Sequence, residues 1–144
     1  MESKLPKKMY SVALSLSDKL DSLVGFFGIN LKPTSSKDPY AIRRMAISLV
    51  RLIVENEIKI KLKDLIVYTC SVYRDQGYEF DTKKIQNELS DFIIERLKNY
   101  LKEKKIRQDI IESSTFLLGL DDLLKAYKKS LCLNKNIKKE IGFE

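Results

Sequence analysis

The sequence predicts an all-α protein, an irregular helical bundle, and three observations favour this class. The 144 residues include only five glycines and three prolines, so few positions interrupt regular structure. Leu, Ile and Lys, which suit helices, are abundant. Apolar residues recur at spacings of three and four along most of the chain. At 44% hydrophobic and 33% charged residues, the composition is that of a globular chain long enough to bury its own core.

The first predicted helix spans about Tyr10 to Gly25, and residues 1–8 are expected to be frayed. Its apolar positions recur at helical spacing: Val12, Ala13, Leu16, Leu20, Leu23 and Val24. Gly25 and Gly28 are expected to loosen its end, ahead of a loop rich in turn-forming residues. Asp38 suits the N-cap of the next helix, and Pro39 suits its first position, where a missing N–H costs nothing.

The second predicted helix runs from Pro39 to about Asn56. Its broad apolar face predicts that it is mostly buried: Ile42, Met45, Ala46, Leu49, Val50 and Ile53. Residues 58–63 alternate between apolar residues and lysine, as a strand would. An isolated strand is unstable, so an extended connection is expected instead. It leads into a third helix from Leu62 to about Arg74, which residues 75–77 should stop.

The fourth helix has the clearest pattern, with Asp81 as its N-cap. One face is apolar: Ile85, Leu89, Phe92, Ile93, Leu97, Tyr100 and Leu101. Acidic residues come early and basic residues late, as the helix dipole prefers. Asp109 is expected to open a short helix, and a last helix should cover Asp121 to about Leu131. The Lys-rich tail, residues 134–144, is expected to be loose.

Charge and cysteine content limit the possible functions. The net charge of +7 fits a nucleic-acid partner, and it fits a merely solvated basic surface equally well. Cys70 and Cys132, in a chain without histidine, cannot close a four-ligand zinc site, so no metal is expected. Free thiols suit the cytoplasm. No run approaches the roughly 20 apolar residues of a membrane span, and the basic start lacks a cleavage site, so neither membrane nor targeting is expected.

Residues 17–44 read SDKLDSLVGFFGINLKPTSSKDPYAIRR. This stretch closely resembles the beta subunit of the bacterial two-subunit glycine–tRNA ligase, whose chains carry a run much like ADKLDTLVGFFGIGLKPTGSKDPFALRR. Here Ser17, Ser22, Asn30, Ser35 and Tyr40 stand where the family has Ala, Thr, Gly, Gly and Phe. The motif positions are shared by both: Asp18, Asp21, Gly25, Gly28, Lys37, Asp38, Pro39, Arg43 and Arg44.

The resemblance implies two partial domains. Residues 1–80 look like the end of an HD-like helical domain and the helices after it. Residues 81–144 look like the start of an anticodon-binding domain with a loose basic tail, since residues 91–97 resemble its opening helix and residues 126–129 its AYKR run. The family's beta subunit is several times longer and has a longer segment between Ser113 and Asp121. The chain therefore resembles a fragment.

In that family the alpha subunit activates glycine with ATP and Mg²⁺, while the beta subunit grips tRNA and the alpha subunit. The resemblance implies that this chain has no catalytic residue or cofactor of its own. Its partners would be glycine tRNA, the alpha subunit and possibly the remaining beta-subunit portions. Two alternatives stay open: a stand-alone basic helical module that binds RNA or protein, and an inactive remnant.

The candidate RNA-binding residues are bases in the part that resembles the anticodon-binding domain: Lys98, Lys102, Lys104, Lys105, Arg107, Lys128 and Lys129. Tyr100 and Tyr127 beside them could stack on RNA bases or belong to the core. In HD hydrolases, an aspartate placed like Asp18 completes a metal site built with histidines, and this chain has no histidine. Asp18 and Asp21 are instead expected to pair with bases such as Arg43 or Arg44.

Overall fold

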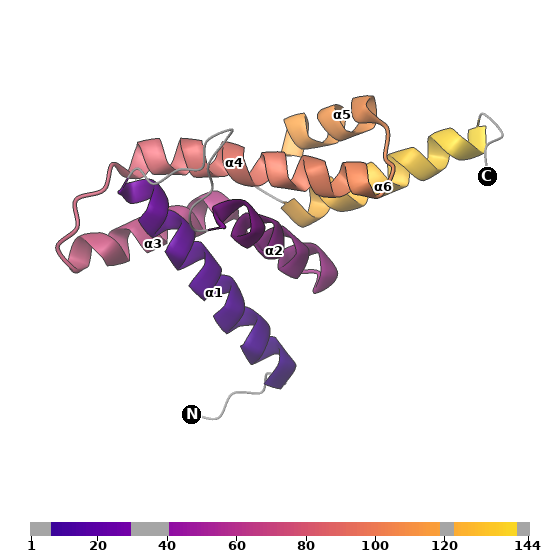
Figure 1. Ribbon diagram of the computed structural model, residues 1–144. Coiled ribbons are helices and arrows are strands. Elements are labelled where there is room, and N and C mark those ends of the chain that lie inside the picture. The colour runs from indigo at the N-terminus through magenta and orange to yellow at the C-terminus, as the bar shows by residue number, and fades with distance from the viewer. Residues whose placement is uncertain (1–6, 30–40, 119–122, 141–144) are drawn as a thin grey trace.

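The protein is described by a computed structural model that covers residues 7–29, 41–118 and 123–140. These residues form six helices and no strand: α1 Lys7–Gly28, α2 Ile42–Glu55, α3 Leu62–Asp75, α4 Thr82–Glu103, α5 Gln108–Leu118 and α6 Leu123–Glu140. The predicted all-α class is confirmed. The long helix α4 is central, with α1, α2 and α3 packed along its first part and α5 and α6 near its other end (Figure 1).

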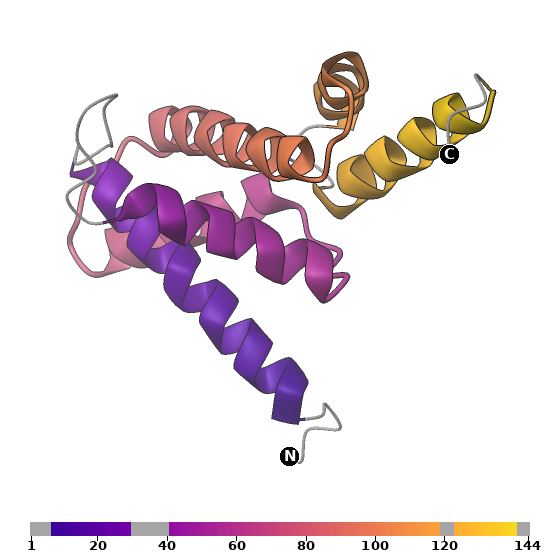
Figure 2. The ribbon, with the colours of Figure 1, turned by 45° about the vertical axis from the view of Figure 1, so that its right-hand side comes forward.

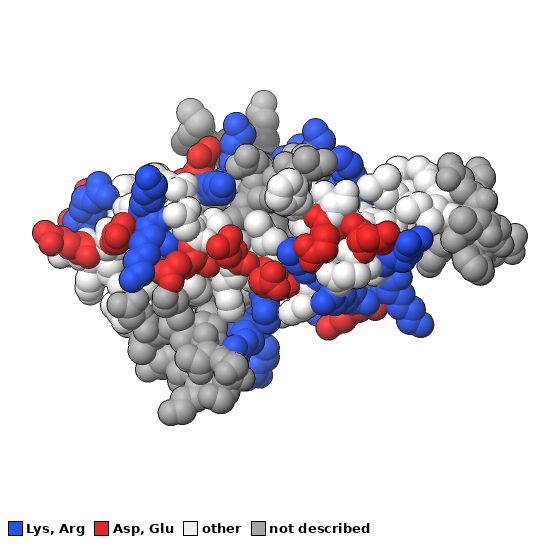
Figure 3. Space-filling model, turned by 90° about the horizontal axis from the view of Figure 1, so that it is seen from above, with Lys and Arg blue, Asp and Glu red and all other residues white. Residues whose placement is uncertain are grey.

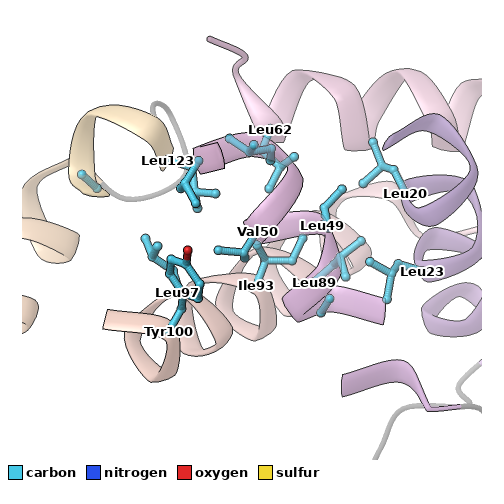
Figure 4. Packing of buried hydrophobic residues seen from close by; sticks show 14 of the residues in the cluster. Leu20, Leu23, Leu49, Val50, Leu62, Leu89, Ile93, Leu97, Tyr100 and Leu123 are labelled. Atoms are coloured by element: carbon cyan, nitrogen blue, oxygen red, sulfur yellow. The ribbon is translucent and has the colours of Figure 1, made fainter. Parts of the chain in front are cut away.

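All six helices contribute to one hydrophobic core. Figure 4 shows side chains from α1, α2, α3, α4 and α6 converging between the helices, among them Leu23, Leu49, Leu62, Ile93 and Leu123. The core crosses residue 80, where the resemblance divides the chain, because α4 packs against helices on both sides of that point. The two-domain division itself stays a prediction.

The alternating segment between α2 and α3 is an extended connection, as expected. Ile58 and Ile60 are half-buried against the core, and Lys59 and Lys61 are exposed. The chain leaves α2 through Glu57, whose φ of 51° is left-handed, and the Ile58 N–H donates to the Ile53 carbonyl at 2.9 Å. This closing bond redirects the chain so that alternate side chains return to the core.

The predicted boundary between α3 and α4 is also confirmed. Gly77 follows α3 with a φ of 98°, and the Tyr78 N–H donates to the Tyr73 carbonyl at 3.0 Å. Glycine suits this left-handed position because it lacks a Cβ. At the start of α4, the Asp81 carboxylate accepts from the Lys84 N–H at 3.2 Å, which caps the helix.

Both ends of α1 differ from the prediction. The helix begins at Lys7, inside the segment expected to be frayed, and it continues through Gly25 to Gly28. Both glycines allow close packing. A Cβ at Gly25 would lie 2.7 Å from the Tyr73 hydroxyl, and one at Gly28 would lie 2.6 Å from the Phe80 ring. The start predicted for the second helix, Asp38 and Pro39, lies outside the described residues.

The last two helices are longer than predicted. Helix α5 continues through the serines at 113 and 114 to Leu118, and α6 continues to Glu140, so the segment expected to be a loose tail is helical as far as that residue. Two hydroxyls bond within their own helices: Thr115 donates to the Ile111 carbonyl at 2.7 Å and Ser130 to the Ala126 carbonyl at 3.0 Å. Packing of α5 against α6 buries both residues.

Candidate RNA-binding surface

The end of α4 meets the start of α6 at a pair of tyrosines. The rings of Tyr100 and Tyr127 lie 5.9 Å apart, and the Lys104 ammonium lies 5.1 Å from the centre of the Tyr100 ring. Tyr100 is buried and Tyr127 half-buried. Burial raises the pKa of Tyr100. The pKa of Lys104 is raised by both tyrosines, and Tyr127 contributes more than Tyr100. Tyr100 is therefore a core residue, and its ring is covered rather than open for stacking.

Lys128 ties α6 to the end of α2. Its ammonium lies 2.7 Å from the Glu57 carboxylate, and this hydrogen bond lowers the pKa of Glu57. Both side chains are more than half exposed, so solvent screens the pair. A phosphate that bound Lys128 would compete with Glu57 for the same ammonium.

Lys98 and Arg107 lie elsewhere, where α4 meets α5. The Lys98 ammonium is 3.2 Å from Glu112 on α5 and 3.6 Å from Glu95, and the Lys98 side chain is only 19% exposed. Arg107 pairs with Asp109 at 3.0 Å. Over α4 and α5, acidic side chains form a nearly continuous row across the molecule (Figure 3). Lys and Arg side chains flank this row on both sides (Figure 3).

Lys102, Lys105 and Lys129 complete the candidate set. All three side chains are exposed, and within the described part of the chain none forms an ion pair. Lys105 follows the end of α4 with a left-handed φ of 62°. The structure thus separates the seven candidates into three bases in ion pairs, one base over tyrosine rings and three open bases.

Asp18 and Asp21 do not make the expected ion pairs. Both are exposed on α1 beside a groove shared with α3, and no ion pair joins either of them to Arg43 or Arg44 within the described ranges. The helix itself is held here by a different contact, because the Tyr73 hydroxyl donates to the Asp21 backbone carbonyl at 3.0 Å. Lys37, the remaining basic motif residue before α2, lies outside the described residues.

Sequence reasoning missed the acidic partners Glu57 and Glu112. Each pairs with a base on another helix, and neither pair has a regular spacing along the chain. Only the packing of α6 beside α2, and of α5 beside α4, brings them into reach. Nothing local in the sequence marks these two carboxylates.

The described residues hold neither a metal-binding group nor a membrane-spanning helix. Within residues 7–29, 41–118 and 123–140, no group of three or more histidine, cysteine or acidic side chains is placed to hold a metal ion. None of the helices in those ranges is both long enough and apolar enough to cross a bilayer. Cys70 is buried, and burial raises the pKa of its thiol, which suits the predicted core role.

Known proteins were then compared with the chain. The family model described as "Glycyl-tRNA synthetase beta subunit" matches residues 1–115. The glycine–tRNA ligase beta subunit of Clostridioides difficile (strain 630) is 34% identical over 136 residues, which cover 94% of this chain and 19% of the relative. That of Ruegeria sp. (strain TM1040) is 36% identical, covering 96% and 18%, and that of Rhodospirillum centenum (strain ATCC 51521 / SW) is 39% identical, covering 88% and 17%. The chain spans about one fifth of the length of these relatives. It belongs to the glycyl-tRNA synthetase beta-subunit family.

Proposed function

We propose that this chain is part of a glycine–tRNA ligase beta subunit, and that it contributes tRNA binding and subunit association to the formation of glycyl-tRNA for protein synthesis. The observation that carries the proposal is the family match over residues 1–115. The net charge of +7 supports an RNA partner, because phosphates attract basic surfaces whatever the sequence. Its partners would be glycine tRNA, the alpha subunit and the remaining portions of the beta subunit.

The charge distribution favours two neighbouring elements for tRNA, the end of α4 and helix α6. Lys102 and Lys105 at the end of α4, and Lys129 on α6, are exposed without ion pairs among the described residues. Lys104 lies beside them and keeps its charge, since its pKa is raised. By contrast, Lys98 and Arg107 are neutralised by neighbouring carboxylates. The tRNA backbone should therefore contact the α4 end and α6, and avoid the acidic row over α4 and α5.

The proposed mechanism is binding without chemistry by this chain. ATP and Mg²⁺ would be used by the alpha subunit, which would carry the active site. We predict that the purified chain, mixed with glycine, ATP, Mg²⁺ and glycine tRNA, forms no glycyl-tRNA. An aminoacylation assay with radiolabelled glycine checks this, and glycyl-tRNA formation above the protein-free background would overturn it.

The binding proposal is tested by a gel-shift titration of the purified chain with glycine tRNA and with a non-cognate tRNA across salt concentrations. Salt-sensitive binding that prefers glycine tRNA is the expected result. Equal binding to both tRNAs would favour the alternative of a stand-alone basic module. No binding at low salt would favour the inactive remnant.

Three lysine substitutions test where the tRNA backbone contacts the chain. Replacing Lys102, Lys105 and Lys129 together by Gln should weaken binding and lower the slope of log affinity against log salt by about 2–3, roughly one per lost phosphate contact. The matched control replaces three exposed lysines far along the bundle, Lys63, Lys83 and Lys84, by Gln. An equal loss in both triple variants would show diffuse attraction and no defined surface.

A further inference from the structure

Helix α1 extends well beyond the helices that pack against it. Two views show its N-terminal half projecting from the body of the bundle, past the end of α2 (Figures 1 and 2). Large apolar side chains on this half are exposed: Met9 at 44%, Tyr10 at 41% and Leu14 at 65%. A projecting helix with exposed apolar residues is marginal in water, since tertiary packing supplies most helix stability.

The apolar row on α1 does not end where the core ends. Met9, Ala13, Leu16 and Leu20 follow one another at spacings of four, three and four, so they lie on one face. Leu20 and Leu16 at one end are buried, whereas Ala13 and Met9 at the other are exposed. The stripe that packs inside the bundle therefore continues outward with no helix over it among the described residues.

A groove lies beside this row, between α1 and α3. Its volume is about 460 Å³, and its walls are mainly apolar. Helix α1 contributes Ala13, Leu16 and Leu20, and α3 contributes Leu65, Tyr68 and Val72. Tyr68 is 66% exposed at its rim. Contiguous exposed apolar surface of this kind marks interaction sites, and a groove between helices suits an amphipathic helix.

Two carboxylates set the charge of the rim. Asp18 and Asp21 line the same groove, and no ion pair joins either to a described base. They would repel RNA phosphates and attract lysine or arginine on a docked segment. A second copy of this chain fits less well, because a two-fold interface would set these acids near their own copies.

We propose that the α1–α3 groove binds an amphipathic helix with Lys or Arg beside its apolar face, supplied by the portion of a glycine–tRNA ligase beta subunit that this chain does not span. The proposal rests on the proposed function. The docked helix can come from the rest of the beta subunit, since more than four fifths of the relatives' length has no counterpart in this chain. The groove also gives the shared motif residues Asp18 and Asp21 a role that the bundle alone does not.

The test is site-specific photo-crosslinking in cells of the organism that carries the gene. The photoreactive residue p-benzoylphenylalanine replaces Leu14, which is 65% exposed and lies one helical turn before Asp18 at the edge of the groove. Mass spectrometry identifies the adduct. An adduct with beta-subunit sequence outside these 144 residues, in the same or in another polypeptide, is the expected result. An adduct with a second copy of this chain, with an unrelated polypeptide, or no adduct at all would overturn the proposal.

Charge reversal distinguishes specific binding in this groove from non-specific hydrophobic association. The double substitution Asp18→Lys with Asp21→Lys should reduce the Leu14 adduct by about tenfold or more, because like charges then face the docked bases. The control, Asp75→Lys with Asp91→Lys, makes the same change in net charge at two exposed acids that do not line the groove, and should leave the adduct unchanged. An equal reduction in both variants would contradict the proposal.

Binding of tRNA by the same variants distinguishes the two proposals. Asp18→Lys with Asp21→Lys should keep the preference for glycine tRNA while the adduct is lost. If the unsubstituted chain shows no preference for glycine tRNA but still forms the Leu14 adduct, the result counts against the proposed function and supports the groove proposal.

Discussion

The two ends of the bundle are held together in different ways. Where α1 and α3 meet α4, aromatic rings interlock: Phe27 lies 5.4 Å from Phe92, and Tyr73 lies 5.0 Å from Phe80. Where α5 and α6 meet, the described residues bury more polar side chains, namely Ser114, Thr115, Ser130 and Asn134. Ion pairs reach from this end to α2 and α4.

This difference indicates which substitutions each end of the bundle tolerates. The first end depends on shape, because glycines allow rings to approach and closely packed apolar side chains leave no room for others. The second end shares the apolar core, and it adds hydroxyl bonds within helices and surface ion pairs, which are individually weak. The exposed Glu57–Lys128 pair can therefore break at low cost.

Leu23→Ala should have the largest effect on stability. Leu23 is fully buried on α1, so truncation leaves a cavity and should cost about 2–5 kcal/mol in the free energy of unfolding. Urea denaturation followed by circular dichroism measures this. The control is Leu131→Ala on α6, where the side chain is 38% exposed and the loss should be much smaller. A similar loss at Leu131 would show that the loss at Leu23 does not come from its burial.

Gly28→Ala should destabilise the chain by about 1–3 kcal/mol, although alanine is the better helix former. The new Cβ would meet the Phe80 ring at 2.6 Å and force it away from Tyr73 and Tyr78. A double-mutant cycle with Phe80→Ala in urea denaturation tests this reason, because the second change removes the clash. Additive losses would show that the glycine acts in some other way.

Ser114→Ala should stabilise the second end slightly, by about 0.5–1 kcal/mol. The Ser114 hydroxyl is buried and has no hydrogen-bond partner among the described residues, so removing it removes a desolvation cost. Ser130→Ala is the matched control, since that hydroxyl donates to the Ala126 carbonyl, and it should show no gain. Thermal unfolding of both variants measures the change in stability. A loss of stability in Ser114→Ala would indicate that the Ser114 hydroxyl forms a hydrogen bond.

The Glu57–Lys128 pair should have the smallest effect, visible in titration rather than in stability. Lys128 lowers the pKa of Glu57, so the pair contributes above the unfolded-state pKa and is lost as pH falls through the folded-state pKa. Lys128→Gln should raise the pKa of Glu57 toward its ordinary value. A carboxyl ¹³C titration by NMR measures this, with Lys129→Gln as the neighbouring control. An unchanged Glu57 pKa in the Lys128→Gln variant would show that solvent screens the pair completely.

Much of the fold could be predicted from the sequence because its signals are local. The Asp81 cap, the stop at Gly77 and the apolar face of α4 each depend on residues within a few turns of one another. The longer α5 and α6 could not be predicted in this way. The Ser113–Thr115 run favours a loop locally, and the Lys-rich sequence after Leu133 favours a loose tail. Both segments are helical because their residues pack between helices, where Thr115 and Asn134 are buried.

The candidate surface shows the same limit. The sequence identified seven bases, but it carried no signal for which of them meet carboxylates on other helices, as Lys98 and Lys128 do. Gly25 and Gly28 looked like helix breakers, and the structure makes them contact points for Tyr73 and Phe80. The pairing expected of Asp18 and Asp21 was wrong, because the side of α1 that they occupy borders the groove with α3.

The sequence by itself determined the helical class, most helix boundaries, the basic charge and the resemblance that led to the family, because periodicity, capping and motif residues all act over short distances. Only the tertiary structure decided which bases stay open, which glycines approach rings and which apolar row continues without a partner. Those properties depend on contacts between helices that lie far apart in the chain, and no local pattern encodes such contacts.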